Sequence, residues 1–248
     1  GGETMTDLLG KSYKIDKSND STAEFYSTVQ YMSPADESIP FGGFNACPFA
    51  TLCKGPCLGH ASGRMRMAPA KQARINRTLL FKQDKPAYGA KLIKETNAHI
   101  RKAEKLGRIP AERLNGCTDI LWENVRFDGL TMMERYPNVV WYDYTKWPLD
   151  RRPSTPNYHL TFSRSERTTL DDIQYNIDNG RNVAVVFDAI PTTWEGWTVI
   201  DGDADDMRWR DPVGVIVGLK AKGDAIKDTT GFVVRLVTKV VNGKIVKL

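Results

Sequence analysis

The run Val183-Ala-Val-Val-Phe187 is apolar at every position, and it decides the fold class of this chain. A strand with one buried face alternates apolar and polar residues, whereas a continuous apolar run is typical of a strand covered on both faces of a parallel sheet. A second run of this kind spans Val213–Leu219. The sequence therefore predicts an α/β protein built on a parallel sheet.

Six further short runs of β-type residues bring the candidate strands to eight. They are Glu24–Met32, Glu112–Asn115, Val139–Tyr144, Tyr158–Phe162, Thr198–Ile200 and Phe232–Val237. Apolar residues at helical spacing predict helices over 68–82, from Pro86 to about Gly107, about Trp122–Glu134 and Leu170–Ile177. The connections between the later strands are too short for full helices. We therefore expect a (β/α) barrel-like domain that is irregular in its second half.

The two ends of the chain differ from its middle. Residues 1–22 are polar and predict a flexible N-terminal arm, so that residues 23–248 form a single domain. Near the C-terminus, Asn242-Gly243 stands between two β-type runs, which predicts a hairpin.

Composition indicates a soluble protein. The chain has 248 residues, of which 41% are hydrophobic and 26% charged, with a net charge of +5. This charge permits weak attraction to nucleic acid, but a solvated basic surface explains it equally well. No apolar stretch approaches the length of a membrane span, and no signal peptide is apparent. We expect no membrane contact and a cytoplasmic, reducing location.

Three of the four cysteines gather in one loop. Cys47, Cys53 and Cys57 form a C-x5-C-x3-C motif in a segment that contains Gly and Pro. Bends at Gly and Pro let a backbone wrap a cluster and offer N–H groups to its sulfides. In a reducing compartment, such clustered cysteines favour a metal over disulfides. The motif predicts a [4Fe–4S] cluster.

Two alternatives to the cluster stay open. Structural zinc sites usually pair cysteines as C-x2-C or C-x4-C, and this loop has neither spacing. Four unrelated buried cysteines would need no metal at all, because unpaired cysteine is often buried.

Cys117 is the expected fourth ligand. In a parallel barrel the loops that follow the strands emerge at one face, and consecutive strands are neighbours. The three-cysteine loop follows the first predicted strand, and Cys117 follows the second. Four thiolates saturate a [4Fe–4S] cluster, which favours electron transfer or a structural role. Three thiolates would leave one iron open for a substrate.

Other polar residues are weaker candidates. The acidic run Asp201–Asp206 resembles half of a calcium loop, but Pro212 stands where that loop needs a Glu, so a polar loop is expected. His60 is placed to tune the cluster, and Arg64 and Arg66 to balance its charge. Polar residues at predicted strand ends are site candidates in a barrel, although most such residues cap backbone: Asp119, Asp143, Ser163, Arg164 and Asp188.

A cysteine loop after the first strand, with barrel-like strands beyond it, resembles the radical S-adenosylmethionine enzymes. Their common motif is C-x3-C-x2-C, from which C-x5-C-x3-C departs. This resemblance implies an enzyme with an open cluster iron as an alternative function.

A closer resemblance is to tailed-phage proteins of the gene-product-88 type, over most of residues 24–235. It rests on the segments CPFATLCKGPCLGHASGR (47–64), RLNGCTDILWE (113–123), WYDYTK (141–146), YHLTFSRSE (158–166) and DPVGVIVGLKAKG (211–223). The resemblance implies phage origin, hence the cytoplasm of an infected host cell, and a cysteine-bound cluster. It implies no particular activity.

Three functions follow as expectations. The first is a redox or structural cluster protein with a redox partner. The second is a radical enzyme that uses an open iron. The third is a non-catalytic module with a structural metal, whose basic helices contact nucleic acid or a host protein.

Overall fold

The computed structural model describes residues 6–50 and 68–248. The chain divides into two compact units. Among the described residues, unit 1 comprises residues 6–48, 68–143 and 154–159, and unit 2 comprises residues 49–50, 144–153 and 160–248. No helix among the described residues is long and apolar enough to cross a membrane.

Eight strands form one largely parallel sheet, which confirms the predicted α/β class. Their order across the sheet is β1 (Phe25–Val29), β2 (Ile109–Arg113), β3 (Val140–Thr145), β4 (Tyr158–Ser163), β5 (Val183–Phe187), β8 (Ile216–Lys220), β7 (Trp197–Asp201) and β6 (Thr193–Trp194). β1 pairs with β2 in parallel, as expected of consecutive strands, whereas β6 and β7 pair antiparallel. Closure of the sheet into a barrel stays a prediction.

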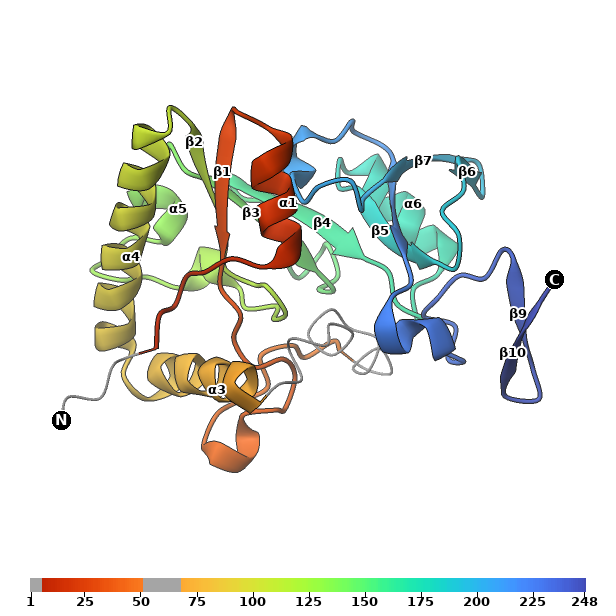
Figure 1. Ribbon diagram of the computed structural model, residues 1–248, viewed down its shortest axis with the longest axis horizontal. Helices are drawn as coiled ribbons and strands as arrows, with labels where there is room; N and C mark the ends of the chain where they lie inside the picture. The colour runs from red at the N-terminus through yellow and green to blue at the C-terminus, as the bar shows by residue number, and fades with distance from the viewer. Residues whose placement is uncertain (1–5, 51–67) are drawn as a thin grey trace. The chain divides into compact units, whose positions relative to one another are not determined.

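Three helices accompany the first strands of unit 1 (Figure 1). They are α1 (Tyr13–Ser21), α3 (Ala68–Gln83) and α4 (Lys85–Lys105). α4 packs on β1 and β2, and it begins where the side chain of Asp84 accepts a hydrogen bond from the N–H of Ala87 at 3.1 Å. Pro86 stands in its first turn, where a missing N–H costs nothing. The two helices predicted on either side of residue 84 are confirmed.

Part of the arm predicted for residues 1–22 is folded. Residues 13–21 form α1, which is capped by the Ser12 hydroxyl accepting from the N–H of Ile15 at 3.3 Å. Leu8 and Ile15 are buried, and Gly10 exchanges two backbone hydrogen bonds with Val29 of β1 at 2.8 and 3.0 Å. Two well-placed apolar side chains and one edge of β1 therefore hold a segment whose average composition is polar.

The apolar runs that decide the fold class form the core of unit 2. Val183, Val185 and Phe187 of β5 are fully buried and pack with Ile216 of β8 and with residues of the helix α6 (Leu170–Asp178). On the other face of β5, Ala184 is buried and Val186 is half-buried. Burial on both faces explains why these strands lack a polar alternation.

Two predicted elements are wrong. The helix predicted over about Trp122–Glu134 is replaced by a 3-10 turn η4 (Trp122–Asn124) and a short helix α5 (Met132–Arg135). Asp128 and Gly129, with φ of 50° and 81°, form a turn between them that no helix can contain. The strand predicted over Phe232–Val237 is reduced to one bridge between Val234 and Phe187.

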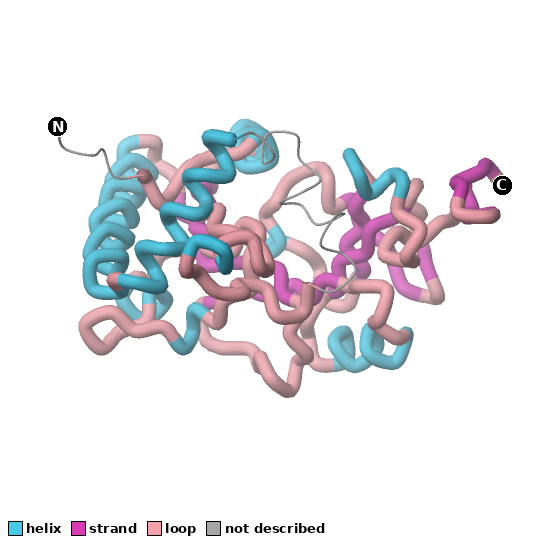
Figure 2. Tube along the Cα trace, turned by 90° about the horizontal axis from the view of Figure 1, so that it is seen from below, coloured by secondary structure: helices cyan, strands magenta, loops and turns pink. Residues whose placement is uncertain are grey.

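The C-terminal hairpin is confirmed. It consists of β9 (Thr238–Val241) and β10 (Lys244–Lys247), and Figure 2 shows it extending from the rest of unit 2 to the C-terminus. Asn242 and Gly243 both have positive φ, as the tight turn of such a hairpin requires. The remaining short elements are η1 (Ile39–Phe41), η5 (Arg208–Arg210) and η6 (Gly223–Lys227).

Candidate functional site

The chain continues beyond β1 as a segment that we name the β1 extension, residues 30–35. Its first residue, Gln30, donates its N–H to the carbonyl of Arg113 at 2.8 Å and accepts from the N–H of Gly116 at 2.9 Å. Two residues further on, the carbonyl of Met32 accepts the Cys117 thiol at 2.9 Å. The β1 extension therefore continues the β1–β2 pairing and sets the position of Cys117.

A glycine makes this approach possible. A Cβ atom added at Gly116 would lie 2.5 Å from the ring of Tyr31 and 2.6 Å from the carbonyl oxygen of Gln30. Real Cβ atoms do not approach backbone oxygen so closely, so any side chain here would push the loop away from the β1 extension. Gly116 thus fixes the backbone directly before Cys117.

The segment that carries Cys47 is held at the same place. Ala46 donates its N–H to Ala35 of the β1 extension at 3.1 Å and accepts from the N–H of Asp119 at 2.8 Å. The neighbour of Cys47 is therefore bonded both to the β1 extension and to residues 114–121 between β2 and η4, which we name the Cys117 loop. Cys47 and Cys117 are 6% and 7% exposed. The two cysteine segments meet where β1 and β2 end, as their order in the sequence predicts.

The other residues expected at this site lie outside the described part of the chain: Cys53, Cys57, His60, Arg64 and Arg66. Within residues 6–50 and 68–248, no three His, Cys, Asp or Glu side chains come close enough together to hold a metal ion. Ligation by Cys47, Cys53, Cys57 and Cys117 stays a prediction.

The Cys117 loop folds around one amide side chain. The Oδ1 atom of Asn115 accepts hydrogen bonds from the Thr118 hydroxyl at 2.7 Å, the Ile120 N–H at 3.0 Å and the Trp122 indole N–H at 3.0 Å. Its Nδ2 atom donates to the carbonyl of Ile120 at 2.9 Å. Asn115 therefore organises the loop on both sides of Cys117. The sequence predicts this residue only as the end of the strand Glu112–Asn115.

Asp143 supports the same loop from β3. Its buried carboxylate accepts from the N–H of Asn115 at 2.9 Å and from the Tyr158 hydroxyl, and it lies 3.6 Å from the Arg113 guanidinium. Asp143 thus holds the backbone of the neighbouring loop in place. This agrees with the expectation that most polar residues at strand ends cap backbone groups. Asp119 is buried as well, and its N–H forms the link to Ala46 described above.

Helix α3 is hydrogen-bonded to the β1 extension through two adjacent residues. The Arg77 guanidinium donates to the carbonyl of Tyr31 at 2.9 Å and to the carbonyl of Asp7 at 2.6 Å. The Thr78 hydroxyl accepts from the N–H of Ser33 at 2.8 Å. Sequence reasoning missed Arg77, because on a helix with several basic residues it looks like part of a solvated face.

The strand-end candidates of unit 2 also bind backbone or neighbouring side chains. Ser163 accepts from the Lys146 ammonium at 3.0 Å, and Arg164 donates to the carbonyls of Gly231 and Phe232 at 3.0 and 2.8 Å. Asp188 accepts four hydrogen bonds from residues 236–238. These contacts tie the C-terminal segment to β4 and β5.

The acidic run behaves as a polar loop. Asp201 accepts from the N–H of Asp203 at 2.9 Å, and Asp205 accepts from the N–H of Met207 at 2.8 Å. Asp203 accepts from the N–H of Lys220 at 2.9 Å. Each of these carboxylates stabilises a turn or the end of β8, as expected of a polar loop.

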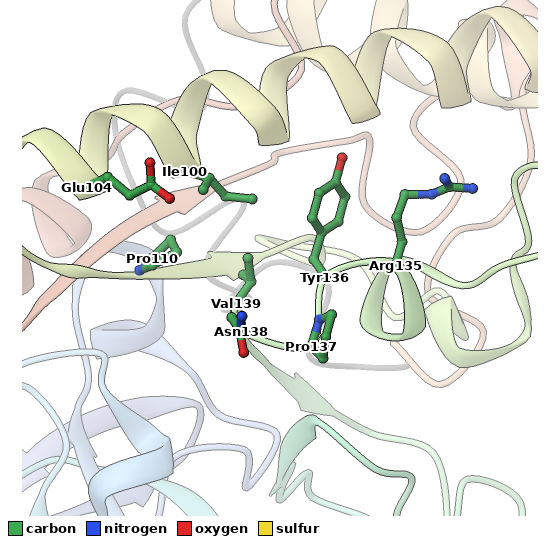
Figure 3. Close-up of a pocket in the computed structure, with 8 residues that line it drawn as sticks. All are labelled: Ile100, Glu104, Pro110, Arg135, Tyr136, Pro137, Asn138 and Val139. Carbon is green, nitrogen blue, oxygen red and sulfur yellow. The ribbon is translucent and has the colours of Figure 1, made fainter.

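A pocket of about 230 Å³ lies elsewhere in unit 1 (Figure 3). It is lined by Ile100 and Glu104 of α4, by Pro110 of β2 and by residues 135–139 before β3. Pro110 is near the start of β2, whereas Cys117 follows its end. The pocket is thus at the opposite end of the strand from the cysteine segments, and its lining includes no cysteine or histidine.

Comparison with known proteins gives one match. No curated protein matches the chain significantly, and no solved structure does. The sequence model of the gene product 88 family matches residues 8–236, a range that contains α1, the whole eight-stranded sheet and all four cysteines and excludes the C-terminal hairpin. The chain therefore belongs to the gene product 88 family.

Proposed function

We propose that this chain binds a [4Fe–4S] cluster on the thiolates of Cys47, Cys53, Cys57 and Cys117, and that the cluster transfers electrons or stabilises the fold. One observation carries the proposal. Two segments about 70 residues apart in the chain, each with a buried cysteine, are bonded to one another through Ala46 and Asp119.

The described half of the proposed site suits a thiolate-bound centre. Cys47 and Cys117 are almost completely buried, which keeps water from the sulfur atoms, and burial is one of the factors that set the potential of an iron–sulfur cluster. Cys117 sits in a loop fixed by Asn115 and Asp143. A ligand on so rigid a loop needs little reorganisation to bind.

The experiment is a metal and sulfide analysis of protein purified without oxygen. We expect a broad absorbance band near about 400 nm and about four irons and four sulfides per chain. Zinc without sulfide would contradict the proposal and leave a structural metal protein. A protein with neither metal nor sulfide would contradict the proposal and leave four cysteines that hold no centre.

Two substitutions of Cys117 separate ligation from folding. Cys117→Ser keeps a donor for the Met32 carbonyl but loses the thiolate, whereas Cys117→Ala loses both. We expect both variants to lose the cluster, with the Ser variant folding better than the Ala variant. A cluster retained unchanged in both would mean that one iron is open. S-adenosylmethionine binding would then be the next measurement, and the radical-enzyme alternative would replace electron transfer.

A further inference from the structure

We propose that Lys11, Lys102 and Tyr26 form a binding site for a phosphate group on unit 1, beside the face of β1 on which α4 packs. The two lysine ammoniums bind the phosphate oxygens, and the Tyr26 hydroxyl is a third hydrogen-bond donor. This site goes beyond the proposed function and does not depend on a cluster, because it involves no cysteine and all three residues belong to the described part of unit 1.

Two ammonium groups from distant parts of the chain converge on the ring of Tyr26. The Nζ atom of Lys11, which stands just before α1, lies 4.6 Å from the centre of the ring. The Nζ atom of Lys102, in the last turn of α4, lies 5.5 Å from the same point. An aromatic ring attracts a cation over its face at such distances. The ring of Tyr26 therefore brings two like charges together at one place.

The ring itself is held firmly between β1 and α4. It is buried, and it stacks on the imidazole of His99 with the two ring centres 5.4 Å apart. The Nε2 atom of His99 lies 3.1 Å from the carbonyl oxygen of Tyr26 and 3.0 Å from that of Ala111 in β2. Both lysines are exposed, so flexible cationic side chains meet over a fixed ring.

No negative charge of the described residues balances the two ammoniums. Within residues 6–50 and 68–248, neither Lys11 nor Lys102 forms an ion pair. Burial raises the pKa of Tyr26, but these ammoniums outweigh burial and hold that pKa below its ordinary value. Burial lowers the pKa of His99 to about 4, and the same two ammoniums act in the same direction. The surroundings of the ring are thus positively charged and suit an anion from outside the chain.

The Tyr26 hydroxyl adds a donor to this place. Its oxygen is buried, and no described residue offers it a hydrogen bond of acceptable geometry, although the ammoniums are close enough to lower its pKa. A buried hydroxyl without a partner is costly. An oxyanion bound by the two ammoniums would supply the missing acceptor.

The type of donor selects a phosphate group. A guanidinium presents a planar fork that matches a carboxylate, whereas an ammonium is a compact point charge with three donors and suits a tetrahedral oxyanion. Because both ammoniums are exposed, the site is open to a free phosphate ion and equally to a phosphate of a nucleic-acid backbone. Binding at such an exposed site weakens as the salt concentration rises.

Titration calorimetry of the full chain with inorganic phosphate, at low salt, tests the site. Lys11→Gln and Lys102→Gln each remove one ammonium and should weaken binding on the order of tenfold, whereas Tyr26→Phe removes only the hydroxyl and should weaken it on the order of threefold. Lys85→Gln is the matched control. It removes an exposed ammonium of α4 that lies 5.1 Å from the ring centre of Phe81, a ring without a hydroxyl, and should bind phosphate as the parent does.

A second titration, with a fluorescently labelled DNA duplex followed by anisotropy, distinguishes the two sources of phosphate. If the lysine variants weaken binding of the duplex as well, the natural ligand is a nucleic-acid backbone. If they weaken binding of inorganic phosphate alone, the site takes a free phosphate or a small phosphorylated molecule. Either result supports the site.

Three results would overturn the site and leave the cluster proposal intact. The first is a parent chain that binds neither probe. The second is equal binding by the parent and by the double variant with Lys11→Gln and Lys102→Gln. The third is an equal loss in Lys85→Gln, because the attraction would then come from the overall positive charge. Unchanged binding in Tyr26→Phe would overturn the donor role of the hydroxyl.

Discussion

The Thr96 hydroxyl donates a hydrogen bond at 3.0 Å to Oε2 of Glu112, and both residues are fully buried between α4 and β2. The other carboxyl oxygen of Glu112 has no hydrogen-bond partner among the described residues. A carboxylate with one donor in an apolar layer is costly, and protonation removes most of that cost. Burial raises the pKa of Glu112 to about 8, with the hydrogen bond from Thr96 acting in the opposite sense.

The Glu112→Gln variant should therefore change how stability depends on pH. Below the unfolded-state pKa near 4.5, both states of the parent are protonated at Glu112. Between that value and about 8, the unfolded chain releases the proton while the folded chain keeps it, so stability falls as pH rises. The loss should reach a few kcal/mol, at about 1.4 kcal/mol per pKa unit.

Urea unfolding at about pH 5 and about pH 8 measures this effect. The variant should be more stable than the parent at the higher pH and similar to it at the lower. The matched control is Glu104→Gln, an exposed carboxylate on α4, the helix that packs on β2, and this variant should follow the parent. A parent whose stability does not decline over this range would contradict a buried, protonated Glu112.

The Gly116→Ala variant should disturb the proposed site most directly. The added methyl group would meet the Gln30 carbonyl oxygen, which cannot rotate away, so the Gly116–Gln30 hydrogen bond should break and Cys117 should move. We expect a loss of about 2–3 kcal/mol in unfolding free energy and a lower cluster content. Gly10→Ala is the control, because a Cβ there meets no atom within 4 Å. Equal stability of the two variants would refute the close approach at Gly116.

The Asp188→Asn variant should loosen the C-terminal hairpin. Burial raises the pKa of Asp188, but hydrogen bonds from Leu236, Val237 and Thr238 outweigh this and hold the pKa below its ordinary value. The carboxylate therefore stabilises the fold above the unfolded-state pKa, and this contribution is lost as pH falls through the folded-state pKa.

Hydrogen exchange of residues 236–248 is the measurement for Asp188→Asn. Exchange should accelerate over residues 236–248, because Asp188 holds the base of the hairpin through these hydrogen bonds. The strands β5 and β8 pair with one another and should keep their protection. Asp178→Asn is a suitable control, because the exposed Asp178 carboxylate accepts from the Gln174 side chain of its own helix and makes no hydrogen bond to residues 236–238. Unchanged exchange over residues 236–248 would show that Asp188 does not anchor the hairpin.

The Tyr158→Phe variant should weaken the support beneath the Cys117 loop. It removes the hydroxyl that donates to Asp143 but keeps the ring, so the buried carboxylate retains Asn115 and Arg113 as partners. We expect a cost of about 1–2 kcal/mol in unfolding free energy and no change in the fold. Thermal unfolding measures it, and the control is Tyr175→Phe, which removes an exposed hydroxyl from α6 and should stay near the parent. Equal melting temperatures would mean that the Tyr158 hydroxyl contributes nothing.

Local patterns in the sequence predict elements whose residues contact their near neighbours. The run Val183–Phe187 coincides with β5, and the Asn-Gly turn predicts the hairpin. The prediction failed at Asp128-Gly129, where two residues with positive φ interrupt an otherwise helical pattern. Within the proposed site, order along the chain predicts that the Cys47 and Cys117 segments meet.

What holds the two segments together was not predictable. The contacts of Gln30, Met32 and Ala46 are made by backbone atoms, which leave no signature in residue type. Asn115 and Arg77 act through side chains, but their partners are carbonyl and N–H groups of distant or irregular segments. Such roles depend on the tertiary arrangement of these segments rather than on the spacing of residues along the chain. The tertiary arrangement cannot be read from a single sequence.

The thiol of Cys117 and the carbonyl of Met32 are 85 residues apart in the chain. During synthesis, Cys47, Cys53 and Cys57 leave the ribosome well before Cys117, and the residues of α3 and α4 are made before those of β2, which pairs with β1. A centre assembled on the nascent chain would first meet three thiolates, and the fourth would arrive only with tertiary closure. For the proposed cluster, a full set of four ligands would thus require the strand pairing of unit 1, and chains truncated before residue 109 would lack Cys117.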